Sequence, residues 1–331
     1  MDVSCAFPTT LESAEHVVVA EQLGYDRAWL YDTPQQSPDV WVVLAQAAQR
    51  TSRIGLGPGV LVPSLRHPVV NAAATATLEA MAPGRLAVSF GTGFTGRKAM
   101  GDKAITWSYM ESYLRAFRGL LRGETVEWDG TAKRMLHPDG SAPPRPVEVP
   151  VLVGALGPKG HRVASALGDG LFVTRRPPEF AREHSWVPLL AWGTVLEEGE
   201  DPTGERVRAA AGPGWALAYH HAWESGGPNA VRELPGGSEW LRVVESQPAG
   251  QQHLAVHSGH CVELNEADRA AWDAGGHSML RRATTLTGTR DEVRESLRDL
   301  ASRGATEIVF QPCGPDPGRE LAVFAEVARS V

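Results

Sequence analysis

Cysteine is scarce in this sequence. The 331 residues include only Cys5, Cys261 and Cys313, which are too few and too scattered for a disulfide framework or a cysteine-rich metal site. An excess of basic residues is missing as well, because 32 Lys and Arg stand against 39 Asp and Glu, a formal net charge of -7. Since nucleic acids are bound by basic faces, this charge argues against a nucleic-acid partner.

Long apolar runs are also absent. No stretch of the sequence approaches the roughly 20 apolar residues that cross a bilayer, so we expect no membrane partner. Residues 2–7 begin the chain without the basic segment and apolar run of a secretory leader. Together with the few cysteines, this predicts a cytoplasmic protein.

What the sequence does contain is a regular alternation of strands and helices. Short apolar runs at 3–7, 27–31, 54–56, 86–90, 149–154 and 169–174 predict strands, and amphipathic stretches between them predict helices. Repetition of this kind predicts a parallel sheet with right-handed crossovers. Six such units in about 175 residues exceed one half of a Rossmann fold, so we expect an α/β fold of the TIM (β/α)8 barrel type.

Two stretches interrupt the pattern. Residues 124–149 are polar and rich in proline, and residues 175–285 are rich in Gly, Pro and Trp. We expect one domain over 1–331, in which both stretches are excursions that cover the barrel mouth and the second is inserted between late strands. The seventh strand is placed near 206–211, and the eighth at 306–311, after an amphipathic helix at 289–303.

Small residues recur where four neighbouring strands end. In a TIM barrel these C-terminal ends form the active site, and small side chains let a flat ligand lie close to the backbone. The last of the four loops leads into a helix N-terminus, where free N–H groups favour a phosphate. The four segments are Asp32-Thr33, Pro58-Gly59-Val60, Gly91-Thr92-Gly93 and Gly154-Ala155-Leu156-Gly157.

Several motifs, taken in order, resemble the bacterial-luciferase-like superfamily of flavin- or coenzyme F420-dependent oxidoreductases, especially its methylene-tetrahydromethanopterin-reductase-like members. The motifs are GYDRAW (24–29), RTSRIGLG (50–57), GVLVPSLRHP (59–68), ATATLEAMAPGRLAVSFGTG (74–93) and PVLVGALGPKGHRVASALGDGLFVT (150–174). The resemblance is dense over 1–175 and resumes at 287–312. It implies a TIM barrel, a homodimer, and hydride transfer between F420, or FMN as the alternative cofactor, and a small organic substrate.

The resemblance also implies where the cofactor lies. The Gly59–Val60 peptide bond is expected to be cis and to form a bulge that supports the central ring. The phosphate end is expected on the backbone amides of Gly154, Ala155, Leu156 and Gly157, with Thr92 and Gly93 on the other side. Asp32 stands where F420-dependent members often place an acidic residue, so it is a candidate for cofactor contact and catalysis; capping of the next segment is the alternative role.

Two positions depart from the family pattern. Thr33 follows Asp32 where many F420-using relatives have His, and Phe94 follows the Gly-Thr-Gly segment where some have Glu. The proton donor of sugar-phosphate-oxidising members is therefore not evident, and we do not expect that reaction. Phe94 is instead a candidate for the wall of the substrate pocket, and the tryptophans of the second excursion favour an apolar substrate.

Five of the eleven histidines lie between positions 220 and 260. His221 is a candidate for proton transfer, because the pKa of histidine lies near neutral pH, and His220 and His260 are candidates for the substrate pocket. A structural role is the alternative for each. His253, His257, His260 and Cys261 raise the question of a metal, but no glutamate completes a zinc-protease motif and the family's chemistry needs no metal, so none is expected.

Three functions therefore stay open. The preferred one is an F420-dependent oxidoreductase. The second is an FMN-dependent monooxygenase that works with a reductase partner, and the third is a non-catalytic homologue that binds a cofactor or pigment. A small-molecule substrate, a flavin or F420 reductase and a second copy of the chain are the expected partners.

Overall fold

Eight parallel strands form a barrel in this protein. The structure is a computed structural model that describes residues 1–174, 176–280 and 285–331. The strands follow the order β3-β2-β1-β10-β9-β8-β7-β4, and single bridges from Leu56 to Leu86 and from Leu61 to Phe90 join β3 to β4. The expected TIM-barrel fold is confirmed. The strands are β1 (Asp2–Phe7), β2 (Arg27–Leu30), β3 (Gly55–Pro58), β4 (Val88–Phe90), β7 (Val151–Gly154), β8 (Gly170–Thr174), β9 (Pro188–Trp192) and β10 (Glu307–Gln311).

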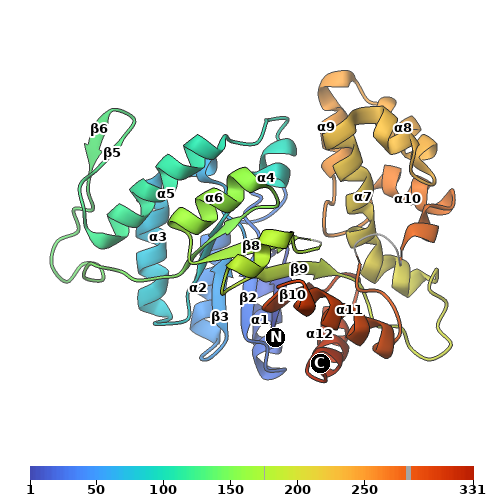
Figure 1. Ribbon diagram of the computed structural model, residues 1–331, viewed down its shortest axis with the longest axis horizontal. Helices are drawn as coiled ribbons and strands as arrows, with labels where there is room; N and C mark the ends of the chain where they lie inside the picture. The colour runs from blue at the N-terminus through green and yellow to red at the C-terminus, as the bar shows by residue number, and fades with distance from the viewer. Residues whose placement is uncertain (175, 281–284) are drawn as a thin grey trace.

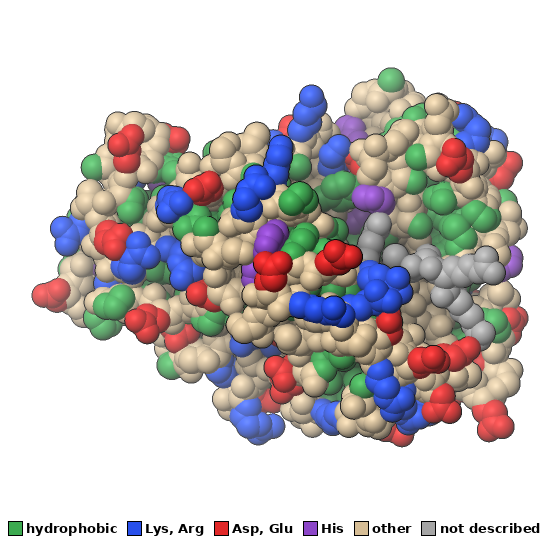
Figure 2. Space-filling view, viewed as in Figure 1, with side chains coloured by type: hydrophobic (Ala, Val, Ile, Leu, Met, Phe, Trp, Pro, Cys, Tyr) green, Lys and Arg blue, Asp and Glu red, His purple; other side chains and the backbone are tan. Residues whose placement is uncertain are grey.

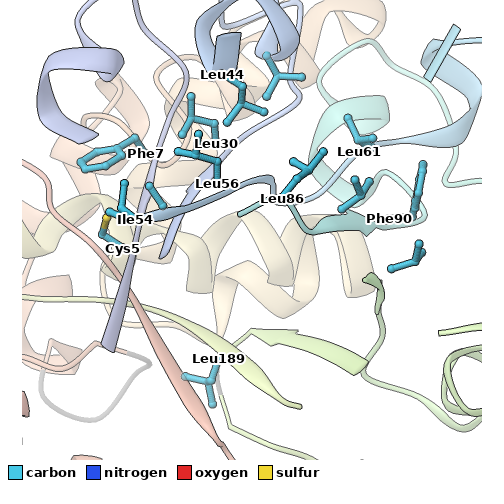
Figure 3. Close-up of a cluster of buried hydrophobic side chains, with 14 of the residues drawn as sticks. Cys5, Phe7, Leu30, Leu44, Ile54, Leu56, Leu61, Leu86, Phe90 and Leu189 are labelled. Atoms are coloured by element: carbon cyan, nitrogen blue, oxygen red, sulfur yellow. The ribbon is translucent and has the colours of Figure 1, made fainter. Parts of the chain in front are cut away.

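Helices cover the outside of the barrel (Figure 1). Their apolar faces pack on the outward side chains of the strands, and this layer is the main hydrophobic core. Figure 3 shows part of it, with Leu30, Leu56 and Phe90 among the buried side chains. The helices are α1 (Ser13–Gln22), α2 (Val40–Arg50), α3 (Pro68–Met81), α4 (Phe94–Lys98), α5 (Trp107–Arg122), α6 (Pro158–Leu167), α11 (Arg290–Ser302) and α12 (Pro317–Ala328), with short 3-10 turns at Pro63–Leu65 and Glu179–Glu183.

The inside of the barrel is filled by side chains at the N-terminal ends of the strands. Glu307 accepts hydrogen bonds from the indole Nε1 atoms of Trp29, at 3.0 Å, and Trp186, at 2.6 Å. The guanidinium of Arg27 lies within 5.4 Å of the ring centroids of both tryptophans. This layer closes one end of the barrel, so a ligand can approach the interior only from the C-terminal ends of the strands.

The seventh barrel strand is β9, and the prediction of a strand near 206–211 is wrong. Residues 206–211 belong to α7 (Glu205–Arg232), whose helical path is broken only at Gly227. β9 is an apolar run buried along its whole length between β8 and β10, as strands of parallel sheets are. The small residues Ala210 and Ala211 are instead buried on one face of a helix.

A helical lobe follows β9 and lies beside the strand ends (Figure 1). It contains α7, α8 (Gly237–Glu245), α9 (Gln252–His257) and α10 (Glu266–Asp273), with 3-10 turns at Ala249–Gln251 and Gly276–Met279. Trp215, Trp240 and Trp272 are buried in a core of its own. The excursion expected at 175–285 contains barrel strand β9 and is largely helical after it, where the structure describes it. Residues 175 and 281–284 lie outside the described residues. None of the described helices is long and apolar enough to cross a bilayer.

The excursion at 124–149 contains an antiparallel hairpin of β5 (Val126–Trp128) and β6 (Thr131–Lys133). The ring of Trp128 packs on Tyr109 and Tyr113 of α5, with centroid distances of 5.6 and 5.5 Å. In Figure 1 the hairpin lies at the opposite end of the molecule from the helical lobe. It therefore covers the outer side of α5, and the helical lobe is the excursion that lies at the barrel mouth.

Candidate active site at the barrel mouth

The ends of β3, β4 and β7 meet around Val60. The Gly59–Val60 peptide bond is cis, as the resemblance implied. A Cβ atom placed on Gly91 would lie only 2.6 Å from Cγ2 of Val60, and one placed on Gly154 would lie 3.6 Å from Cγ1 of Val60. Val60 and Gly154 are both partly exposed. Three of the four strand ends that the sequence analysis singled out therefore lie together around Val60.

Thr92 and Gly93 carry the chain from β4 into α4. Gly93 adopts a left-handed conformation, with φ of 82°, at the N-cap of that helix, a conformation that glycine adopts without steric cost. The next residue, Phe94, is 39% exposed, and its ring centroid lies 5.8 Å from that of His221 on α7. Phe94 and His221 thus form a contact at the rim, where the barrel meets the helical lobe.

The loop after β7 leads into the N-terminus of α6. Gly157 is the N-cap residue and has no side chain of its own to cap the helix, and a Cβ atom placed on Gly157 would have no neighbour within 4 Å. Leu156 is 52% exposed. Because first-turn amides of a helix lack carbonyl partners and carry a partial positive charge, the open space at Gly157 suits an anionic group. Figure 2, in the same view as Figure 1, shows Lys and Arg side chains beside Asp and Glu side chains over the middle of the molecule.

Asp32 forms an ion pair with Arg66. Nη1 of Arg66 lies 2.7 and 2.6 Å from the two carboxylate oxygens of Asp32, and Nη2 lies 2.7 Å from Oδ2 of Asp39. Burial raises the pKa of Asp32, which is 3% exposed, and the hydrogen bond from Arg66 opposes that rise. The capping role considered for Asp32 belongs to Asp39, whose Oδ1 accepts the N–H of Trp41 at the start of α2.

A buried glutamine joins the barrel to the helical lobe. Gln311, at the end of β10, is 0% exposed. Its Oε1 accepts hydrogen bonds from Nε1 of Trp192, at 2.7 Å, and from the hydroxyl of Tyr31, while its Nε2 donates to the carbonyl oxygen of Cys261. Local patterns in the sequence gave no signal for this contact, because the pairing of Gln311 with Cys261 spans 50 positions.

The adjacent histidines of α7 have different surroundings. His220 is 2% exposed; its Nδ1 lies 2.6 Å from Nδ1 of His260 and its Nε2 lies 3.0 Å from Oδ1 of Asp268. His221 is exposed, and its ring nitrogens lie 3.3 and 3.4 Å from Oγ of Ser225. His220 and His260, which were expected to line the substrate pocket, are thus directed at one another, whereas His221 is at the rim.

Two surface hollows lie away from these residues. One, of about 800 Å³, is lined by Arg118, Pro150 and Asp169 near the start of β7, and one of about 480 Å³ is lined by Tyr109 and Trp128. We assign the site to the barrel mouth instead, because ligands of TIM barrels bind at the C-terminal ends of the strands. The mouth also brings Val60, Gly91 and Gly154 together near the N-terminus of α6, where Gly157 has open space, and this arrangement suits a planar ring that carries a phosphate.

Known proteins resemble this chain in sequence and in fold. The family model described as luciferase-like monooxygenase matches residues 8–307. The chain is 34% identical to F420-dependent glucose-6-phosphate dehydrogenase of Beutenbergia cavernae, over 94% of this chain and 89% of that protein. It is 31% identical to 5,10-methylenetetrahydromethanopterin reductase of Methanolobus tindarius, over 96% of this chain and 95% of that protein. The solved F420-dependent tetrahydromethanopterin reductase of Methanopyrus kandleri has a TM-score of 0.67 at 20% identity, over 100% and 99% of the two chains, which shows a shared fold.

Proposed function

Since the chain belongs to the luciferase-like monooxygenase family, we propose that it is an F420-dependent oxidoreductase that transfers a hydride between the deazaflavin and a small, apolar organic substrate. The observation that carries the proposal is the surface that Val60 forms with Gly91 and Gly154, which ends at the open N-terminus of α6. The F420-dependent relative at 34% identity supports the choice of this cofactor over FMN.

The residues at the mouth fit such a cofactor. Val60 would support the planar ring, Thr92 and Gly93 would line the bound group, and the backbone amides around Ala155, Leu156 and Gly157 would hold the phosphate. When bound, F420 supplies the hydride, and the protein supplies binding and orientation.

The chain's own side chains fix the site and move the proton. The pair of Arg66 and Asp32 holds the segment after β3 against the end of β2. Gln311, with Tyr31 and Trp192, closes the floor of the mouth and excludes water from it. His221 holds the proton that the substrate takes up or gives away, because it is the exposed histidine beside Phe94 at the rim. Asp32 acts on the site through its ion pair with Arg66.

The apolar surface for the substrate comes from the rim. Phe94 and Leu156 are 39% and 52% exposed there. Two of the tryptophans that first favoured an apolar substrate do not supply this surface, because Trp215 and Trp240 are buried in the core of the helical lobe. A sugar phosphate fits this rim poorly, because the apolar Phe94 follows β4 where some relatives have Glu. We therefore propose a substrate of a different class from the glucose 6-phosphate named for the Beutenbergia cavernae relative.

We also propose that the active form is a homodimer. Val42 of α2 and Val70 of α3 are 59% and 51% exposed, and the two helices are in contact with one another. Sedimentation of the purified chain tests this, and a monomer at micromolar concentration would contradict it.

Titration of the purified protein with each cofactor tests the function. We expect binding of F420, and consumption of reduced F420 that depends on one or more members of a panel of enones, imines and unsaturated lactones. Tight FMN binding with no response to F420, together with oxygen consumption in the presence of a flavin reductase, would identify the FMN-dependent monooxygenase instead. Cofactor binding without turnover of any panel member would favour the non-catalytic homologue.

A further inference from the structure

Three histidines meet inside the helical lobe, beside the candidate active site. His220 comes from α7, His257 is the last residue of α9, and His260 lies in the turn that follows. Their exposed fractions are 2%, 2% and 6%. One ring nitrogen from each lies within 4.8 Å of the others. Three buried imidazoles at this distance are a ligand set for a transition-metal ion.

The Nε2 atom of each ring already has a partner. Nε2 of His220 lies 3.0 Å from Oδ1 of Asp268, Nε2 of His257 lies 3.1 Å from Oε1 of Glu224, and Nε2 of His260 lies 3.1 Å from the hydroxyl of Thr95. Each ring therefore has only its Nδ1 atom left for another contact.

The carboxylates also determine which nitrogen carries the proton. A carboxylate only accepts hydrogen bonds, so the Nε2 atoms of His220 and His257 must be the protonated ones. The carboxylate of Asp268 also accepts hydrogen bonds from two further donors, Nε1 of Trp240 at 2.9 Å and the backbone N–H of Asn265 at 3.2 Å. In the neutral rings, the Nδ1 atoms of His220 and His257 are left with free lone pairs.

One of these lone pairs has no partner. Nδ1 of His257 is buried and accepts no hydrogen bond from any described residue. The other two Nδ1 atoms, of His220 and His260, can share one proton at their distance of 2.6 Å, but that pairing leaves His257 unsatisfied. An unpaired buried acceptor is costly, so the set is complete only with a further group at its centre.

We propose that His220, His257 and His260 bind one divalent transition-metal ion, with Zn²⁺ the best match, through their Nδ1 atoms. Zn–N bonds of 2.0–2.1 Å in a tetrahedron place the ligand nitrogens about 3.3 Å apart, which compares with the 4.8 Å within which one nitrogen of each ring already lies. Hydrogen bonds from the second ring nitrogen to carboxylates are typical of metal-bound histidines. The ion joins α7 to α9 and, through Thr95, fixes α4 at the rim of the site.

The proposal revises the expectation from the sequence that no metal binds. That expectation rested on the missing glutamate of a zinc-protease motif and on a family chemistry that needs no metal, and it did not include His220, which comes from a different helix. The metal site is also independent of the proposed hydride transfer, because the ion has a structural role. Failure of zinc binding would not contradict hydride transfer, and failure of hydride transfer would not contradict zinc binding.

Zinc titration of the untagged full chain, freed of metal with a chelator, tests the site. We expect one Zn²⁺ per chain, a higher Tm with Zn²⁺ than without it, and visible absorption bands of tetrahedral Co²⁺ when Co²⁺ replaces Zn²⁺. His257→Gln keeps a donor for Glu224 but removes the Nδ1 ligand, so it should lose stoichiometric binding and the rise in Tm. His253→Gln is the matched control on α9 and should bind like the wild type.

Substitution of a carboxylate gives a graded test. Asp268→Asn should weaken Zn²⁺ binding about 10–100-fold, the usual loss when the partner of a metal-bound histidine is changed. If His257→Gln does not fold, which circular dichroism reveals, the Co²⁺ spectrum of the wild type still decides. Absence of stoichiometric Zn²⁺ and tetrahedral Co²⁺ bands in the wild type, or equal Zn²⁺ affinity in wild type and a folded His257→Gln variant, would overturn the proposal.

Discussion

The guanidinium of Arg66 lies 2.6 Å from the carboxylate of Asp32, and the two side chains are only 13% and 1% exposed. Asp32 follows β2 and Arg66 follows β3, so the pair joins two neighbouring strand ends of the candidate site. Loss of one partner from an ion pair so little exposed to water strongly destabilises the folded protein, because the remaining charge is left unpaired in the protein interior.

Arg66→Met should therefore destabilise the protein by about 3–5 kcal/mol. The double variant with Asp32→Asn should lose less than the sum of the two single variants, because the unpaired charge is gone. Urea unfolding of the four proteins measures this coupling. Strictly additive losses would mean that the two groups do not interact.

The phosphate position proposed at Gly157 can be tested by charge. Gly157→Asp introduces a good N-cap residue for α6, so stability should be unchanged or slightly higher. A negative charge there should repel a cofactor phosphate and weaken F420 binding at least about 10-fold, which corresponds to roughly 1.4 kcal/mol.

Gly157→Asn is the matched control, because asparagine has almost the same shape as aspartate and caps helices equally well without the charge. It should bind F420 much more tightly than Gly157→Asp. Equal affinity in the two variants, measured by fluorescence titration, would place the phosphate elsewhere.

The three cysteines should be unreactive in the folded protein. All are buried and free, and burial raises the pKa of Cys313 to about 12 against an opposing hydrogen bond from Gln311. Burial raises the pKa of Cys5 and Cys261 in the same direction. Because the thiolate is the reactive form, raised pKa values leave almost none of it at pH 8. A thiol reagent should label none of the three at pH 8 in native protein and all of them in guanidinium chloride; rapid labelling of the native chain would contradict this burial.

The barrel and the helical lobe should unfold together, as the proposed single domain requires. The lobe has its own hydrophobic core, but Gln311 binds Cys261, Lys98 binds Glu224 and Gln36 binds the carbonyl of His257 across the boundary. We expect thermal curves from far-UV circular dichroism and tryptophan fluorescence to coincide. Two separate transitions would show that the lobe is an independent unit.

Most of the barrel could be predicted from sequence because its strands are short apolar runs at regular spacing. The seventh strand and the lobe were missed for a physical reason: Pro213, Gly212 and Gly214 resemble helix breakers, yet they lie within α7. A Cβ on Gly214 would lie 2.3 Å from Cβ of Trp192, so glycine lets α7 approach β9 closely. Tertiary packing outweighs the local propensity here.

The candidate site was predicted only in part. Backbone features such as Gly59–Val60 and the loop at Gly157 are local, and motifs reveal them. The partners of Asp32, His220 and Gln311 are not local, because Arg66, Asp268 and Cys261 lie 34, 48 and 50 positions away. Such pairs become visible only when the chain is folded.

The absorbance spectrum of the protein, purified from a host that makes both F420 and FMN, tests the central claim most directly. We expect the single visible band of oxidised F420 to copurify with the wild-type chain and to diminish in the Gly157→Asp variant. The two-band spectrum of FMN in its place would contradict the assignment of this chain as an F420-dependent oxidoreductase.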